Sequence, residues 1–317
     1  MIKDQLRIVF MGTPEFAVAC LKKLVEKGYK VVGVITAPDR PAGRGRKLNQ
    51  SAVKTYALKQ NLKVLQPKNL KDQTFIEELK ELEANLQIVV AFRMLPKQVW
   101  QLPKYGTFNL HASLLPHYRG AAPIHWAIIN GETQTGLSTF FIDEKIDTGQ
   151  IIMQEKMTIE PDETVGELHD RMMTIGAELI IKTVESIKNE TIELTVQTNS
   201  EELKTAYKLD RDNTKINWKL PLDVIYNKIR GLNPFPSAWS QLMNGEEVMD
   251  VKIYAVTKER ASHNEDFGHI FTSKTELKVA VKDGYIRILE LQLPGKRKMD
   301  VQSLLNGFHF EEDAKML

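Results

Sequence analysis

Residues 6–36 read LRIVFMGTPEFAVACLKKLVEKGYKVVGVIT, in which a helix-like segment lies between two short apolar runs. The runs at residues 6–10 and 31–36 have the apolar, β-branched character of buried strands in parallel sheets. Pro14 stands at a first-turn position, where its missing N–H is tolerated, and Gly28 is suited to end the helix. The stretch therefore predicts a strand, a helix and a second strand.

The same alternation continues through the first half of the chain. Further apolar runs occur at residues 64–65, 87–91 and 106–110, and helical spacing occurs at 51–60 and 74–83. Strands that alternate with helices predict an α/β fold with a doubly wound, mainly parallel, Rossmann-like sheet. Ligands bind beyond the carboxyl ends of the strands in such sheets.

The second half changes character. Residues 151–159 predict another strand and residues 164–187 a long amphipathic helix, after which the sequence turns polar. Beyond that polar stretch, short alternating runs suggest a small OB-like β-barrel. We therefore expect a catalytic domain at residues 1–189, a linker at 190–206 and a C-terminal domain at 207–317.

Composition sets broad limits on the class of protein. With 317 residues, 42% hydrophobic and 26% charged, the chain is expected to form two soluble domains. A net charge of +2 neither demands nor excludes a nucleic-acid partner. The single cysteine, Cys20, cannot form an internal disulfide, and no apolar run approaches the roughly twenty residues of a membrane span. We expect a cytoplasmic protein without a membrane partner.

A cluster of polar residues follows the run at 106–110. Asn109 and His111 are two residues apart on the expected strand, so their side chains leave the same face. An amide N–H and an imidazole N–H can both donate to an oxyanion, and Asp147, at a later polar turn, could orient His111. A lone His at a strand end is more often structural, but the combination favours acyl transfer.

Longer motifs surround these three residues. The pattern Asn109-x-His111, Ser113-Leu114-Leu115-Pro116 and Asp147-Thr148-Gly149 resembles the formyltransferases that use 10-formyltetrahydrofolate. Within that superfamily, the chain is similar to the bacterial methionyl-tRNA formyltransferases at residues 10–17, 38–48, 206–209, 216–218, 230–239 and 294–299. The resemblance extends over nearly the whole chain.

The resemblance implies a reaction and roles for the three residues. The formyl-donor substrate would be 10-formyltetrahydrofolate, and the acceptor the α-amino group of methionine on initiator methionyl-tRNA. Such an amine titrates at about pH 8, so part of it is already a neutral nucleophile in the cell. Asn109 would donate to the oxyanion, His111 would help to stabilise it, and Asp147 would position His111 and an ordered water for proton transfer.

Two segments are expected to bind the folate. One is the loop after the strand, which could supply an apolar wall and backbone hydrogen bonds. The other, at residues 90–96, is one residue shorter than the corresponding run of the family. Arg119 and Gly120 are weaker candidates for the donor's glutamate tail or for fixing the loop. The expected folate-binding residues are Ser113, Leu114, Leu115, Pro116, Phe92, Arg93, Met94 and Leu95.

Two basic segments are expected to bind tRNA. Residues 38–48 gather cations among Pro and Gly residues, a composition that predicts no regular element and can present guanidinium groups to phosphates. A solvated basic loop is the plain alternative, whereas the resemblance implies entry into the acceptor arm. The expected tRNA-binding residues are Arg40, Arg44, Arg46 and Lys47 in this loop, and Lys296, Arg297 and Lys298 in the C-terminal domain.

Other functions are compatible with parts of the sequence. A formyltransferase acting on a small amine, such as glycinamide ribonucleotide or a nucleotide-linked amino sugar, would have the same N-terminal site. An oxidoreductase is disfavoured because residues 12–17 lack the second glycine of the dinucleotide fingerprint, and a pure RNA-binding module because the site residues are intact. We expect no metal, since no His, Cys, Asp or Glu cluster has ligand spacing, and we expect a monomer.

Overall fold

The computed structural model describes residues 5–42, 47–198 and 202–317 and divides the chain into two compact units. The first, here called the sheet unit, comprises Met1–Gly120, Gly136–Met157 and His169–Thr205. The second, the barrel unit, comprises Ala121–Thr135, Thr158–Leu168 and Ala206–Leu317. Each unit thus draws on more than one stretch of sequence, and the domain boundaries expected at residues 189 and 207 stay predictions.

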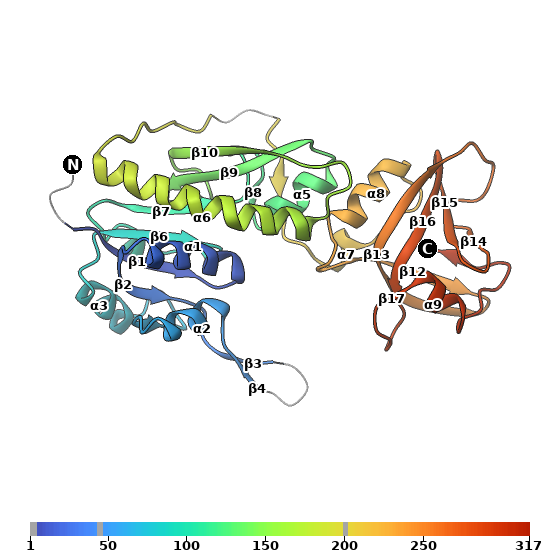
Figure 1. The fold of residues 1–317 in the computed structure, drawn as a ribbon, viewed down its shortest axis with the longest axis horizontal. Coiled ribbons are helices and arrows are strands. Elements are labelled where there is room, and N and C mark those ends of the chain that lie inside the picture. Colours follow the sequence, from blue (N-terminus) through green and yellow to red (C-terminus); the bar gives the residue numbers. More distant parts are fainter. Residues whose placement is uncertain (1–4, 43–46, 199–201) are drawn as a thin grey trace. The chain divides into compact units, whose positions relative to one another are not determined.

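The sheet unit is built on a mainly parallel sheet (Figure 1). Its order is β10-β9-β7-β6-β1-β2-β5, in which the ladders from β7 to β5 are parallel and β9 runs antiparallel to β7. The strands are β1 (Arg7–Gly12), β2 (Lys30–Ile35), β5 (Val64–Leu65), β6 (Leu86–Val90), β7 (Thr107–His111), β9 (Gln134–Phe141) and β10 (Ile151–Thr158).

Helices cover both faces of this sheet. On one face, Gly176 lies against Leu110 of β7, Leu137 of β9 and Phe16. On the other face, residues around 75–82 pack into a buried cluster with Val9 of β1. The helices are α1 (Glu15–Glu26), α2 (Ala52–Lys59), α3 (Gln73–Glu81), α4 (Lys97–Trp100) and α6 (Val165–Asn189). The predicted doubly wound class is confirmed.

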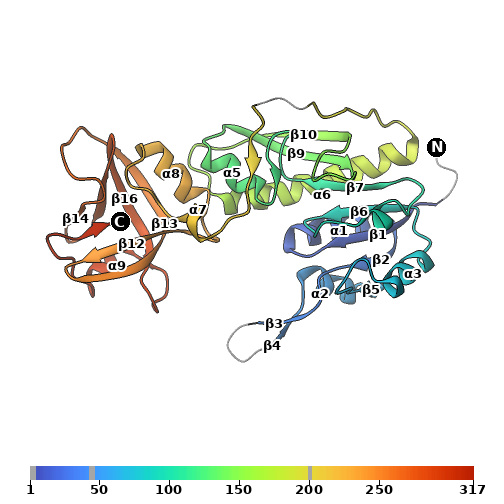
Figure 2. The same ribbon diagram turned by 180° about the vertical axis from the view of Figure 1, so that it is seen from behind.

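The basic loop at residues 38–48 differs from expectation. Strands β3 (Arg40–Ala42) and β4 (Lys47–Asn49) pair antiparallel and form a ribbon that extends away from the sheet (Figures 1 and 2). The prediction of no regular element was wrong for its two arms. Pro41 does not prevent pairing, because a two-stranded ribbon has open edges where a residue without an N–H is tolerated.

The barrel unit is an antiparallel sheet that closes on itself. Its order is β14-β15-β16-β13-β12-β18, with β17 paired to β16. Closure comes from Met316 N–H donating to the Gly268 carbonyl at 2.8 Å and Ile270 N–H to the Ala314 carbonyl at 3.1 Å. The strands are β12 (Ala238–Asn244), β13 (Glu247–Arg260), β14 (Ile270–Thr272), β15 (Leu277–Val281), β16 (Gly284–Gln292), β17 (Met299–Asp300) and β18 (Lys315–Met316).

One apolar core fills the barrel unit. Leu222 and Ile225 of α8 are fully or nearly fully buried with Ile253 of β13, and the buried Trp218 donates its indole N–H to Ser240 at 2.8 Å. The remaining elements are α5 (Pro123–Ile129), α7 (Arg211–Thr214), α8 (Leu222–Arg230), α9 (Val301–Leu305) and the short strands β8 (Arg119–Gly120) and β11 (Thr205–Ala206). Among the described residues, no helix has both the length and the apolar character needed to span a membrane.

Candidate active site

Asn109 and His111 lie at the carboxyl end of β7, as the sheet topology requires of a ligand site. Asn109 is paired with Val89 of β6 and with Phe140 of β9, and His111 with Ser138. Because the two positions are two residues apart on one strand, both side chains leave the same face of the sheet.

The Asn109 amide has an unsatisfied polar atom. Its Oδ1 is buried and has no hydrogen-bond partner among the described residues. A buried polar atom without a partner costs roughly 1–3 kcal/mol, so such atoms mark places where a ligand completes the hydrogen bonding. Rotation of the amide plane presents either an acceptor oxygen or an NH2 donor at this position. The geometry suits a ligand with both a donor and an acceptor.

The imidazole of His111 is held by two groups. Its Nε2 lies 2.8 Å from the carbonyl oxygen of Tyr118, and its Nδ1 lies 3.8 Å from Oδ2 of Asp147. A carbonyl can only accept, so Nε2 carries the hydrogen of this bond. The other ring nitrogen, Nδ1, faces the carboxylate. Only 7% of the His111 side chain and 15% of the Asp147 side chain are exposed.

Asp147 reaches His111 from the loop between β9 and β10, residues 142–150. Its backbone is left-handed, with φ of 55°, and its Oδ2 accepts the Gly120 N–H at 3.0 Å. Gly149 permits the turn to close, because a Cβ there would lie 1.6 Å from the carbonyl oxygen of Phe141. The structure thus brings together the three residues that the sequence singled out as catalytic candidates.

The loop after β7 is fixed against β9. Ser113 is fully buried, donates to the His117 carbonyl at 2.7 Å and accepts from the Ser138 hydroxyl at 2.6 Å through its own carbonyl. The N–H of Leu115 donates to Ser138 at 3.0 Å, and its side chain is buried with Phe140 and Ile151. Leu114 and Pro116 are half-buried. Loop backbone and these two side chains remain candidates for folate contact.

The second expected folate segment follows β6. Leu95 is buried in the core, Phe92 packs against that core, and Met94 is 67% exposed. Arg93 donates to the carbonyls of residues 67 and 68. Burial, and then the nearby charge of Arg40, lower the pKa of Arg93. The four side chains point to different surroundings, and their role in folate binding stays a prediction.

Comparison with known proteins shows which family this chain resembles. Residues 6–184 match the family model described as "Formyl transferase", and residues 208–309 match "Formyl transferase, C-terminal domain". The chain is 55% identical over 313 residues to the methionyl-tRNA formyltransferase of Flavobacterium johnsoniae, with 99% of each chain covered. It is 50% identical over 321 residues to that of Bacteroides thetaiotaomicron, with all of both chains covered.

The chain belongs to the methionyl-tRNA formyltransferase family. It is an enzyme of the formyltransferase class, as the resemblance implied. Solved structures share the fold of this family member. A sugar 3N-formyl transferase has a TM-score of 0.65 at 21% identity, covering 93% of this chain and all of its own. The N-formyltransferase from Helicobacter canadensis has a TM-score of 0.64 at 22% identity with the same coverage.

The basic ribbon carries the first group of cations expected to meet the acceptor in this family. Arg40 is exposed on β3, whereas Arg44 and Arg46 lie outside the described residues, and of Lys47 only the backbone in β4 is described. The base of the ribbon is anchored by Asp39, which accepts from Lys54 at 2.5 Å and from Gln66 at 2.8 Å. The hydrogen bonds from Gln66 and Lys54 lower the pKa of Asp39.

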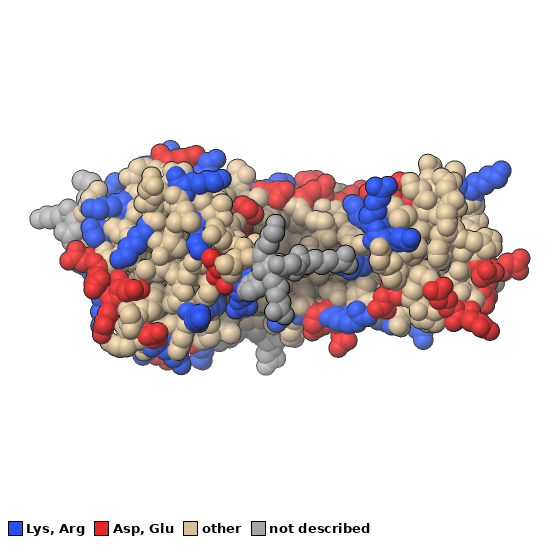
Figure 3. All heavy atoms as spheres, turned by 90° about the horizontal axis from the view of Figure 1, so that it is seen from below, with Lys and Arg blue, Asp and Glu red and all other residues tan. Residues whose placement is uncertain are grey.

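The second group of cations lies after β16 in the barrel unit. Lys296 and Arg297 are exposed and, within the described chain, their side chains form no hydrogen bond or ion pair. Lys298 instead pairs with Glu290 at 2.6 Å. On the face drawn in Figure 3, the described Lys and Arg side chains are interspersed with Asp and Glu. The described residues on that face therefore form no single continuous basic field.

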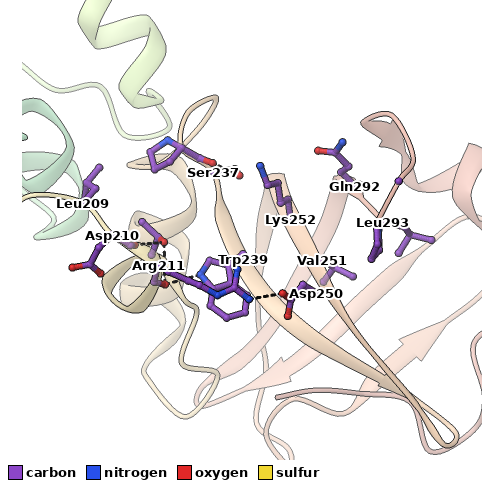
Figure 4. A pocket seen from close by; sticks show the side chains of 14 residues that line it. Leu209, Asp210, Arg211, Ser237, Trp239, Asp250, Val251, Lys252, Gln292 and Leu293 are labelled. Carbon is purple, nitrogen blue, oxygen red and sulfur yellow. Dashed lines mark hydrogen bonds and ion pairs between the residues drawn. The ribbon is translucent and has the colours of Figure 1, made fainter. Parts of the chain in front are cut away.

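A cavity of about 550 Å³ opens beside these cations in the barrel unit. Figure 4 shows Arg211 extended along Trp239 toward Asp250; its guanidinium carbon is 4.0 Å from the ring centroid. Lys252 and Gly295, the residue before Lys296, also line the cavity. No local sequence pattern indicates this cavity, since Arg211 and Trp239 are 28 residues apart in sequence. An aromatic ring with adjacent cations suits a nucleotide.

The sequence patterns also gave no sign of two backbone groups at the candidate site. The Tyr118 carbonyl and the Gly120 N–H contact His111 and Asp147, and any residue type supplies such groups. The described residues contain no group of three or more His, Cys, Asp or Glu side chains that could hold a metal ion.

Proposed function

We propose that this chain transfers the formyl group of 10-formyltetrahydrofolate to the α-amino group of methionine on initiator methionyl-tRNA. In this reaction the amine nitrogen attacks the formyl carbon, and the bond from that carbon to the folate nitrogen breaks. A proton leaves the amine, and the departing folate nitrogen gains one. The observation that carries the proposal is the buried, unpartnered Oδ1 of Asn109, on the same strand as the His111 that faces Asp147.

Asn109 is suited to the central step. Its NH2 can donate to the oxygen that becomes negatively charged, while its orphaned oxygen can accept an N–H of the attacking amine. Because β7 lies between β6 and β9, the backbone that carries this amide is held by two neighbouring strands before the substrate arrives. Such preorganised donors stabilise the tetrahedral intermediate without reorganising during the reaction.

His111 and Asp147 serve the proton transfer and the oxyanion. The Nε2 hydrogen of His111 is donated to the Tyr118 carbonyl, so only Nδ1 is left to donate a hydrogen bond to the substrate. Nδ1 also faces the Asp147 carboxylate at 3.8 Å, a separation that an ordered water can bridge. Asp147 accordingly orients His111 and that water, and collects the proton from the amine.

The two substrates are assigned to different residues. The folate is proposed to bind beside the loop Ser113–Pro116 and the segment Phe92–Leu95, where half-buried apolar side chains and loop backbone meet the catalytic edge. The tRNA is proposed to contact the basic ribbon through Arg40, Arg44, Arg46 and Lys47. In the barrel unit we assign it to Lys296, Arg297 and Lys298, next to the Trp239 cavity. A monomer acting in the cytoplasm, where tRNA is charged, is part of the proposal.

An acceptor comparison tests the proposed function. Purified enzyme and 10-formyltetrahydrofolate are supplied with charged initiator methionyl-tRNA, with glycinamide ribonucleotide or with a nucleotide-linked amino sugar, and formylated product is quantified. The proposal predicts product with methionyl-tRNA alone and its loss in Asn109→Ala. Formylation of either small amine without formylation of methionyl-tRNA would overturn the acceptor assignment.

A further inference from the structure

The polar segment expected to be a linker is tied to the catalytic edge of the sheet unit. Thr195 exchanges two backbone hydrogen bonds with Ile151, the first residue of β10, at 2.8 and 2.9 Å. Farther along, the Lys204 carbonyl accepts the Tyr118 N–H at 2.6 Å. The described parts of this segment therefore lie against the elements that carry the site, rather than forming a free tether.

Gln197 makes the closest connection to Asp147. Its Nε2 donates to the carbonyl oxygens of Asp147 and Gly149, at 2.9 and 2.8 Å. Its Oε1 accepts from Nε and Nη2 of Arg119, at 3.1 and 2.7 Å. Both hydrogens and the oxygen of the amide are thus used, and only a planar group with two donors and an acceptor can make all four contacts.

These contacts hold two segments in place at once. One is the turn in which Asp147 adopts its left-handed backbone, a conformation that persists only when the surroundings enforce it. The other is the stretch from Tyr118 to Gly120, whose carbonyl and N–H contact His111 and Asp147. Gln197 bridges the main chain of Asp147 and the side chain of Arg119. In sequence, Arg119 lies between Tyr118, which contacts His111, and Gly120, which contacts Asp147.

We infer that Gln197 is a positioning residue for the formyl-transfer step, which fixes the Asp147 carboxylate relative to His111. The inference rests on the proposed function of that site. Without the amide, the Asp147 turn loses both clamping donors, and the 3.8 Å relation between Oδ2 and Nδ1 is no longer enforced. The backbone of Asn109 and the loop after β7 have other partners and keep their places. Catalysis is therefore expected to fall while substrate binding is retained.

Two variants and a matched control test this. Gln197→Ala removes all four contacts, and Gln197→Glu keeps the shape but replaces the two donors with an oxygen facing two carbonyls. Val196→Ala, at a neighbouring side chain that is 67% exposed, is the control. For each enzyme, kcat and the KM for both substrates are measured with methionyl-tRNA, along with the thermal unfolding midpoint.

Both Gln197 variants are expected to lose kcat by about 10- to 100-fold, the scale of a misplacement of roughly 1 Å, with each KM within about twofold of the control. A kcat equal to that of Val196→Ala would overturn the inference. So would a fall in kcat accompanied by matching rises in both KM values and a lower unfolding midpoint, which would indicate a structural role alone. If the unsubstituted enzyme formylates no methionyl-tRNA, the proposed function fails first, and that outcome is distinct.

Discussion

The proposed catalytic site, at the carboxyl end of β7 in the sheet unit, and the cations after β16 in the barrel unit are organised in opposite ways. At the sheet edge, His111 and Asp147 are largely buried, and backbone groups of Tyr118 and Gly120 fix them. On the barrel, Lys296 and Arg297 are exposed. The proposed catalytic side chains of His111 and Asp147 thus already have protein partners, whereas the side chains of Lys296 and Arg297 have none among the described residues.

Substitutions in the two regions should change different kinetic constants. Preorganised donors at a buried site act on charge that develops in the transition state, so losing one lowers turnover sharply. Exposed cations act on phosphates through an electrostatic term that is screened by salt and spread over many contacts. Substitutions at the sheet edge should therefore change kcat, and substitutions on the barrel should change the KM for tRNA.

Asn109→Ala is expected to have the largest effect. Removal of the amide takes away an oxyanion donor, so kcat should fall by about 10²- to 10³-fold, with little change in the KM for either substrate. Steady-state formylation of methionyl-tRNA measures this. If kcat/KM falls only because KM rises, Asn109 contributes equally to binding of the substrate and of the transition state. That result would break the contrast between the two regions.

Asp147→Asn should have the next largest effect. The amide oxygen can still accept the Gly120 N–H, but the charge facing Nδ1 of His111 is lost, and kcat should fall by roughly a hundredfold. Asp143→Asn is a matched control in the same loop, because Asp143 contacts Thr148 and the Lys145 N–H rather than His111. Similar losses in both variants would attribute the effect to the loop as a whole.

Arg297→Ala should have a modest effect that depends on salt. Loss of one phosphate contact should raise the KM for methionyl-tRNA and reduce the slope of log affinity against log salt by about one, while kcat and the KM for folate stay unchanged. Glu290→Gln removes the negative charge that pairs with Lys298, so this variant should lower the KM for methionyl-tRNA. An unchanged salt slope in Arg297→Ala would remove Arg297 from the tRNA-binding surface.

Treatment of the folded enzyme with a thiol reagent should have no effect on activity, because Cys20 is not accessible to it. Its side chain is fully buried in α1, and burial raises the pKa of the thiol to about 12, so the thiol stays neutral at assay pH. A thiol-specific disulfide reagent should therefore react with the folded enzyme far more slowly than with the unfolded chain, and leave formylation unchanged. Fast labelling with loss of activity would contradict the structural role.

Local patterns explain why part of the site could be predicted. The period of two along a strand placed Asn109 and His111 on one face, and the alternation of strands and helices placed them at a carboxyl end. The position of Asp147 at a polar turn suggested that it could orient His111, and the family resemblance supported this role, but no local rule predicts the approach itself. It depends on a glycine turn and on a left-handed residue between two strands.

Other parts could not be predicted for physical reasons. The Tyr118 carbonyl has no signature because every residue has a carbonyl, and Gln197 acts on a turn 50 residues earlier in the chain. The basic ribbon was predicted without regular structure because Pro and Gly dominate local propensity, although β3 and β4 need only a few backbone hydrogen bonds. Contacts that depend on tertiary proximity are absent from local patterns.

The most direct test is single-turnover formylation at saturating 10-formyltetrahydrofolate with increasing methionyl-tRNA, for the unsubstituted enzyme, Asn109→Ala and Arg297→Ala. The limiting rate should fall only in Asn109→Ala, and the tRNA concentration giving half that rate should rise only in Arg297→Ala. A limiting rate unaffected by Asn109→Ala would contradict the assignment of formyl transfer to the edge of the sheet.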